Sequence, residues 1–308
     1  MLRRRPALLI RPELDDHALH SVLDELRPGR QLHGLGAGRT RPLWEPVADL
    51  LGATGRDWDR RVHRVAVLAR NLPPSVGDRW AADRPGDGDA LVLGAWAGAV
   101  RAAAEGRGAA RRAERACLRA AECCPEDPTP WLALLELMRS LAVPPREAVP
   151  VWSEAVTRAP WLRAAYHQML RHLSPRGHGT VGDMLDFARQ AAARVPHGSP
   201  LVLLPVAARV ELVAHRRTAL GAESHWHEPR AADEVAVALS DWFHAVTAPH
   251  AEAVADLNVL AFALIRLHRP AEAAAVFRRI GRHMTPHPWE LLPEPERTFL
   301  YWRDRPVR

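Results

Sequence analysis

The residues best able to do chemistry lie in one polar stretch that is rich in histidine. His225 and His227 are two residues apart and are followed by a glutamate, while His215 and His244 lie near its ends. Imidazole and carboxylate groups are ligands for transition metals. The stretch lacks the pair of histidines four residues apart on a helix that marks metalloproteases. We interpret it as a solvated loop, and keep as the alternative a helical enzyme or metal-binding protein that uses residues 215–244.

Other sequence patterns that could indicate catalysis are incomplete. Residues 29–38 hold Gly34, Gly36 and Gly38 beside arginines, but the Lys-Ser or Lys-Thr pair of a phosphate-binding loop does not follow. We predict a flexible linker there. No G-x-S-x-G sequence marks a nucleophilic serine, and paired carboxylates lie at predicted helix starts, where they complement the helix dipole. The sequence gives no catalytic residue, no cofactor and no metal ligand, which favours a non-enzymatic protein.

The arginines of the chain suggest nucleic acid, but their setting does not support it. All 42 basic Lys+Arg residues are arginine and the net charge is +6, which we attribute to GC-rich codon usage; the charge favours only weak attraction to anionic partners. Arg111, Arg112, Arg115 and Arg119 would form a basic strip on one helix, yet glutamates interrupt it and no set of stacking aromatics accompanies it. We therefore do not expect a nucleic-acid partner.

Cysteine usage and hydropathy bear on the compartment. Cys117, Cys123 and Cys124 lack the paired C-x-x-C spacing of a zinc site, and we predict buried, reduced thiols. No apolar run approaches the ~20 residues that a membrane-spanning helix needs. The apolar run that follows the arginines at the start is too short for an export signal. We expect a cytoplasmic protein that contacts no membrane.

Helical periodicity organises the chain. An apolar face with the spacing i, i+3, i+4 and i+7 occurs at about the same interval in three segments: Trp96, Ala99, Val100 and Ala103; Trp131, Leu134, Leu135 and Met138; Tyr166, Met169, Leu170 and Leu173. Pro73-Pro74 is predicted to end a helix, residues 80–89 to form a turn, and Asp87 to begin the helix that carries Trp96. Ser199 is predicted to cap the helix that follows it.

The helix after the second of these faces carries Ala148, Trp152, Ala155 and Pro160 at spacings of four, three and five. This pattern resembles the tetratricopeptide (TPR) repeat, a unit of about 34 residues, over roughly residues 90–285. In such repeats small residues let neighbouring helices approach, and the aromatic fills the space between hairpins. The chain is also similar to actinobacterial-type proteins of this build, a resemblance that implies no activity.

The TPR resemblance implies an all-α protein in which TPR-like hairpins stack into an α-solenoid with non-repeat helical ends. We predict an N-terminal helical cap over residues 1–84, a repeat array over 85–285 and a C-terminal capping segment over 286–308. The implied function is a non-enzymatic protein- or peptide-binding module of a bacterial cytosol, with the partner held in a concave groove lined by the first helices of the hairpins.

Residues next to the apolar stripe of those first helices would face the groove. By this rule the groove-facing residues are Arg101, Glu105, Glu136, Arg139, Ser140, His167, Arg171, Asn258 and Arg266. We predict that Arg101, Glu136, Arg139, His167, Arg171, Asn258 and Arg266 bind the partner. Arginines in a groove hold the carboxylates of an extended peptide by charge-assisted hydrogen bonds. The alternative is that these are ordinary solvated side chains.

Overall fold

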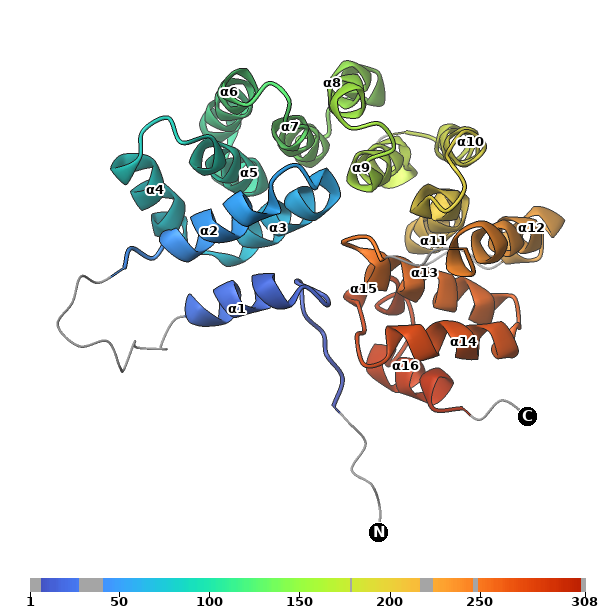
Figure 1. The fold of residues 1–308 in the computed structure, drawn as a ribbon. Helices are drawn as coiled ribbons and strands as arrows, with labels where there is room; N and C mark the ends of the chain where they lie inside the picture. Colours follow the sequence, from blue (N-terminus) through green and yellow to red (C-terminus); the bar gives the residue numbers. More distant parts are fainter. Residues whose placement is uncertain (1–6, 28–40, 178, 217–223, 246–248, 306–308) are drawn as a thin grey trace, which may run out of the picture. The chain divides into compact units, whose positions relative to one another are not determined.

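The computed structural model describes residues 7–27, 41–177, 179–216, 224–245 and 249–305 (Figure 1). Over these residues the chain forms sixteen α-helices with short 3-10 and π segments. No β-strand occurs in the described ranges, apart from an isolated bridge between Leu9 and His283. The predicted all-α class is therefore confirmed. The linker predicted at residues 29–38 lies outside the described residues.

Contacts divide the chain into two compact units, which are described separately. The N-terminal unit comprises Asp16–Met169, and the C-terminal unit comprises Leu170–Arg308 together with Met1–Asp15. The boundary falls within a helix, α9 (Arg163–Leu173). The predicted division at residues 84 and 285 follows the repeat pattern instead, and it stays a prediction.

The N-terminal unit is built around one long helix, α5 (Gly88–Glu105), which contacts α2, α3, α4, α6 and α7 (Figure 1). Its other helices before α9 are α1 (His17–Glu25), α2 (Glu45–Thr54), α3 (Trp58–Asn71), α4 (Pro74–Asp83), α6 (Arg107–Cys123), α7 (Thr129–Ser140) and α8 (Pro145–Arg158). Trp96 of α5 and Leu132 and Leu135 of α7 are buried in the interior. The predicted apolar faces lie only partly in the core, because Ala103 of α5 is exposed and Trp131 and Met138 of α7 are half-buried. Burial of the apolar side chains supplies the main driving force for folding.

Capping side chains and prolines set the ends of these helices. The Asp87 carboxylate accepts hydrogen bonds from the amides of Asp89 and Ala90, which confirms Asp87 as the predicted start of α5. The turn predicted at residues 80–89 is wrong at its beginning, because Trp80 lies within α4 and is fully buried. Pro74 both follows one helix and begins the next, since a proline in the first turn of a helix costs no hydrogen bond.

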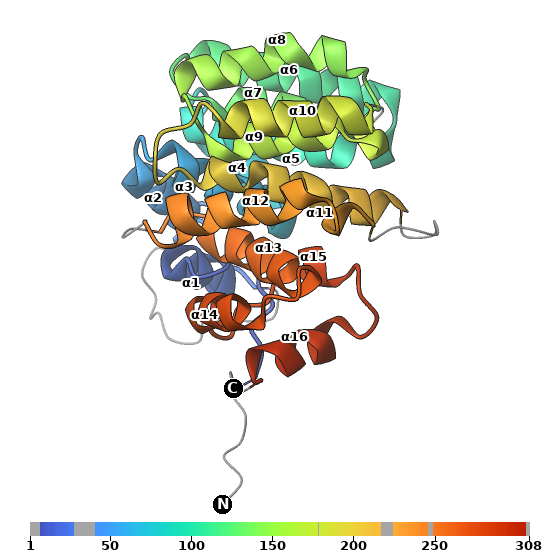
Figure 2. The same cartoon turned by 90° about the vertical axis from the view of Figure 1, so that its right-hand side faces the viewer.

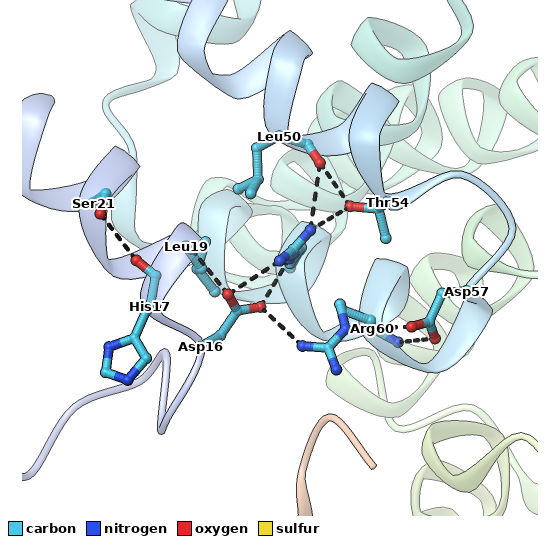
Figure 3. A network of polar contacts seen from close by, with 9 residues as sticks. Asp16, His17, Leu19, Ser21, Leu50, Thr54, Asp57 and Arg60 are labelled. Atoms are coloured by element: carbon cyan, nitrogen blue, oxygen red, sulfur yellow. Dashed lines mark hydrogen bonds and ion pairs between the residues drawn. The ribbon is translucent and has the colours of Figure 1, made fainter. Parts of the chain in front are cut away.

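Buried ion pairs join the first three helices of the N-terminal unit (Figure 3). Arg64 of α3 donates from Nε to Asp16 Oδ2 at 2.8 Å and from Nη1 to Thr54 Oγ1 at 2.7 Å. Asp16 also caps α1 by accepting from the amide of Leu19 at 3.0 Å. The three polar side chains are mostly buried, so the network holds α1 and α2 on α3 at sites where unpaired charge would be costly.

A second buried arginine ties α3 to the starts of two later helices. Arg61 donates from Nε to Asp127 Oδ2 at 2.7 Å and from Nη2 to Asp89 Oδ1. Asp127 in turn accepts from the amide of Thr129 at 2.8 Å, at the start of α7. The prolines and carboxylates that mark the loop before α7 in the sequence thus also fix its position on α3.

The C-terminal unit is built around α13 (Ala253–Arg266), which contacts α11, α12, α14 and α15 (Figure 2). Its remaining helices are α10 (Val181–Ala192), α11 (Leu204–Arg216), α12 (Pro229–Ala238), α14 (Pro270–Ile280), α15 (Pro286–Trp289) and α16 (Pro295–Arg303). Phe262, Phe277, Trp289 and Phe299 form a buried aromatic cluster with ring centroids 5.2–5.9 Å apart. The last two helices therefore cover the apolar faces of α13 and α14.

The beginning of the chain belongs to this C-terminal unit. The Leu9 amide donates to the carbonyl of Arg282 at 2.9 Å, and the Met284 amide donates to the carbonyl of Leu9 at 3.0 Å. This pairing joins segments more than 270 residues apart in the sequence, so local periodicity could not predict it.

The histidine-rich stretch is only partly a solvated loop. Arg209 of α11 is fully buried and donates to Glu234 Oε2 and to the carbonyl of His225. His225 and Trp226, in a 3-10 turn (Ser224–Trp226), are buried as well. The prediction that these two residues lie in a solvated loop is therefore wrong, because the buried guanidinium holds their backbone against α11.

Candidate functional site

A cavity with a volume of about 850 Å³ lies within the N-terminal unit. Residues from the end of α3, from α4, from α5 and from α6 line it. Both α4 and α6 border α5 (Figure 1), and the cavity opens between them over one face of α5. We call this space the α4–α6 cavity. Its volume falls within the range of about 300–1,000 Å³ that is usual for binding sites.

Small side chains form the floor of the α4–α6 cavity. Ala90, Gly94 and Ala97 follow one another along α5 at spacings of four and three residues and all line it, which places them on one helix face. A Cβ atom added at Gly94 would have no other heavy atom within 4 Å. The α5 surface at Gly94 is therefore open to an approaching ligand.

The walls of the α4–α6 cavity combine apolar and charged groups. Leu118 of α6 lines the cavity and is 40% exposed. The charged lining residues are Asp78, Arg101, Arg115, Arg119 and Glu122. Apolar walls with a few charged groups at fixed positions are typical of a site that binds an amphipathic partner.

Two arginines of this set have no partner within the described chain. Arg115 and Arg119 are exposed on α6 and form no ion pair with any described residue, whereas Arg101 Nε lies 3.5 Å from Glu105 Oε1. Unpaired guanidinium groups beside an apolar recess attract carboxylates and hold them by charge-assisted hydrogen bonds. The sequence showed both arginines as part of a basic strip, but it gave no sign that they border a cavity.

The order of charges along the cavity follows from how α5 and α6 run. A Cβ atom at Gly98 would lie 3.6 Å from Ala113 Cβ, and one at Gly88 would lie 2.7 Å from Cys124 Sγ. The two helices are therefore antiparallel and closely packed. As a result the arginines of α6 lie beside the middle of α5, and Glu122 lies near its beginning.

Two of the three cysteines near the cavity have thiols with a raised pKa. Burial, with a smaller contribution from the charge of Glu114, raises the pKa of Cys117 to about 12. Burial is also the largest cause of the raised pKa of Cys124. Cys123 lines the cavity and is exposed, so the prediction that all three thiols are buried is wrong for this residue. A thiol of raised pKa is a poor nucleophile and a poor metal ligand at neutral pH.

The predicted partner-binding residues of α7 form an ion cluster with an arginine that sequence reasoning missed. Glu136 Oε1 accepts from Arg139 Nη2 at 2.8 Å and from Arg70 Nη2 at 3.1 Å. Glu136 and Arg139 are absent from the lining of the α4–α6 cavity, so they do not share that site with Arg101. His167 lies on α9 and is half-buried. Arg70 lies in the last turn of α3, and only its contact with α7 reveals it.

The predicted residues of the C-terminal unit have different settings. Arg171 is exposed at the end of α9, and Arg266 lines a separate cavity of this unit. The prediction that Asn258 faces a groove is wrong, because its side chain is fully buried. Its amide donates to the carbonyls of Val254 and His283 and accepts from the indole of Trp289 at 2.7 Å. Asn258 thus has a structural role in joining α13 to the C-terminal segment.

Family models, curated protein sequences and solved structures give no match to this chain. The candidate site therefore rests on its own geometry.

The sequence left open a metal site within residues 215–244 as an alternative. No group of three or more potential metal ligands comes together among the described residues. His225 is buried beside Trp226, with ring centroids 5.1 Å apart, whereas His227 and His244 are exposed.

None of the helices in the described part of the chain is both long enough and apolar enough to cross a membrane.

Proposed function

We propose that this protein is a TPR-like interaction module of a bacterial cytosol that binds an acidic, amphipathic peptide helix in the α4–α6 cavity. Consecutive helices pack in pairs, α5 with α6, α7 with α8 and α13 with α14. Two of these first helices also contact the helix that follows their own pair: α5 contacts α7, and α13 contacts α15. Such nearest-neighbour packing is expected of stacked helical hairpins, and it supports an α-solenoid of the TPR type.

The observation that carries the proposal is an open apolar recess bordered by unpaired arginines. The exposed floor residue Gly94 lets a second backbone approach α5 closely, and a helix laid in a groove is a common mode of peptide recognition. Arg115 and Arg119 would face acidic residues on one side of that helix. Exposed Leu118 would then be covered by the apolar side of the partner.

The position of this site differs from that of the predicted groove. Arg101 is the one predicted partner-binding residue that lines the α4–α6 cavity, while the other predicted residues of the N-terminal unit do not. A module of this kind needs no catalytic group, and the raised pKa of Cys117 speaks against a nucleophilic role for that buried thiol.

A selection from a random peptide display library tests the proposal. We expect the recovered peptides to be acidic and to show apolar residues at helical spacing. Arg115→Glu combined with Arg119→Glu should raise the dissociation constant of the best peptide by at least about tenfold, because two charge-assisted contacts become repulsive. The dissociation constant is measured by fluorescence anisotropy with a labelled peptide.

The matched control uses two arginines of the same helix that do not line the cavity. Arg111→Glu combined with Arg112→Glu makes the same change in net charge on α6, and it should leave the affinity within about twofold. Equal weakening by both double variants would show general charge attraction in place of a site. Recovery of no helical acidic peptide would also refute the proposal.

A further inference from the structure

The contacts between α5 and α6 fix the level of each charged group along the α4–α6 cavity. The carbonyl of Ala95 lies 3.9 Å from Cys117 Sγ, and a Cβ atom at Gly98 would lie 3.6 Å from Ala113 Cβ. Residues farther along α6 therefore lie beside residues earlier in α5, and each residue advances a helix by about 1.5 Å. The positions of the charged groups of both helices can thus be compared along the axis of α5.

The acidic residues of the lining lie at one end of this axis. Glu122, near the end of α6, lies level with the first turn of α5. Asp78 of α4 is about half a turn before Trp80, whose indole Nε1 donates to Asp87 Oδ2 at 3.2 Å beside the start of α5. Asp78 and Glu122 are exposed, and neither forms an ion pair with any described residue. We call these two residues the acidic end of the cavity.

Basic residues follow along the same axis. Arg119 and Arg115 precede Glu122 on α6 by three and seven residues, which places them about 5 Å and 10 Å farther along the cavity. Arg101, in the second half of α5, lies beyond both. Its ion pair with Glu105, at 3.5 Å, is partly exposed, and such surface pairs contribute little to stability. The cavity is therefore negative at the beginning of α5 and positive over its middle and end.

A partner must match this order of charges to avoid contacts between like charges. We infer that the peptide helix bound in the α4–α6 cavity carries a basic residue at one end of its apolar face, facing Glu122, and acidic residues one to two turns farther along, facing Arg119 and Arg115. The inference rests on the proposed function, and it adds a second charge and a fixed direction to the acidic helix proposed above. Charges at the border of an interface fix orientation and partner choice more than affinity.

The same charges disfavour the reversed peptide. A reversed helix would place its basic residue beside the arginines of α6 and its carboxylates beside Asp78 and Glu122. Each of these contacts joins like charges, whereas the open floor at Gly94 does not distinguish the two directions. The acidic end of the cavity thus excludes helices that are acidic along their whole length, and it gives the site specificity by repulsion.

The peptides recovered from the display library give the first test. We expect a Lys or Arg at one end of the apolar face and Asp or Glu one to two turns away from it. Recovery of acidic helices that lack this basic residue would overturn the inference and leave the proposed function standing. Recovery of no acidic helix would remove both.

A charge exchange between the full chain and the tightest of these peptides gives the second test. Glu122→Arg should raise the dissociation constant of the peptide about fivefold in fluorescence anisotropy, because an attractive contact becomes repulsive. Replacement of the basic residue of the peptide by Glu should bring the dissociation constant for the Glu122→Arg variant back to within about twofold of the original value. A Lys at the facing acidic position of the peptide should restore binding to the Arg115→Glu variant in the same way.

Glu114→Arg is the matched control, because Glu114 is exposed on the same helix but does not line the cavity. It makes the same change in net charge and should leave the dissociation constant within about twofold. The inference is overturned if Glu114→Arg and Glu122→Arg weaken binding equally. It is also overturned if the Glu122→Arg variant binds the exchanged peptide no better than the selected one.

Discussion

Asp16 and Arg64 show how single residues hold the N-terminal unit together. Burial is the largest influence on the Asp16 carboxyl and raises its pKa, but hydrogen bonds from Arg64 and the Leu19 amide, with the charges of Arg64 and Arg60, lower the pKa overall. A folded pKa below the unfolded value of about 3.9 means that ionised Asp16 stabilises the fold. That stabilisation is present above the unfolded value and is lost as the pH falls through the folded pKa.

We expect Asp16→Asn to lower the free energy of unfolding by about 1–3 kcal/mol at pH 7, since Arg64 loses its charged partner but keeps a neutral acceptor. The difference between the two proteins should shrink as the pH falls below about 4. Urea unfolding at a series of pH values measures both effects. The neighbouring Asp15→Asn makes the same charge change at an exposed position and should have little effect. A difference that grows on acidification would contradict this account of Asp16.

Some residue roles were predictable from the sequence and others were not. Asp87 at the start of α5 follows a local rule, because a cap depends on amides two and three residues away. Asn258 also lies beside an apolar stripe, as a groove residue would, but its partners outside α13 are 25 to 31 residues away. Only the return of the C-terminal segment onto α13 decides that this amide is buried, and periodicity contains no information about that return.

At the scale of elements, Asn258 connects α13 to the segment that leads into α15. The Asn258 Oδ1 accepts from the Trp289 indole at 2.7 Å and from the Thr285 amide at 3.4 Å. Replacement of the amide by an apolar side chain of similar size leaves these two donors buried without a partner. Each buried donor without a partner destabilises the fold by about 1–3 kcal/mol. The substitution should therefore weaken the attachment of this segment to α13.

We therefore expect Asn258→Leu to destabilise the C-terminal unit by about 2–4 kcal/mol and to speed amide hydrogen exchange over residues 283–290. Peptide binding at the α4–α6 cavity should persist. Asn71→Leu is the matched control, because the Asn71 amide also donates to the carbonyl four residues earlier but is exposed. Loss of partner binding with unchanged exchange would instead restore Asn258 as a contact residue.

The helices themselves follow from sequence more directly than the spaces between them. Apolar spacing predicted part of the buried faces of α5 and α7, including Trp96 and Leu135, since each face is a property of one helix. The start of α4 was missed because Pro73-Pro74 signals both a stop and a start. The α4–α6 cavity depends on how far α4 and α6 lie apart across α5, which is set by tertiary packing such as the stacking of Trp80 on Trp44 at 5.7 Å.

At the scale of the whole molecule, the chain consists of two units. The predicted arginines Arg101 and Arg266 line separate cavities, one in each unit. The sequence predicted arginines as recognition groups, but it could not assign them to cavities. That assignment required the tertiary contacts of each unit.

If a partner helix occupies the α4–α6 cavity, a side chain that fills the floor of the cavity should block the binding of that helix. Gly94→Leu adds a side chain at a position where a Cβ atom meets nothing within 4 Å, and Gly52→Leu does the same on α2, away from the cavity. Both changes replace a helical glycine by a better helix former, which favours folding by about 0.5–1 kcal/mol. Neither variant should therefore unfold the protein.

The measurement is the affinity of a selected acidic peptide for the original chain and for these two variants, by fluorescence anisotropy. We predict that Gly94→Leu weakens binding by at least about tenfold, because the new side chain occupies space that the partner needs, while Gly52→Leu binds as the original chain does. Unchanged affinity of the Gly94→Leu variant would show that the partner does not lie on the floor of this cavity, and it would contradict the account.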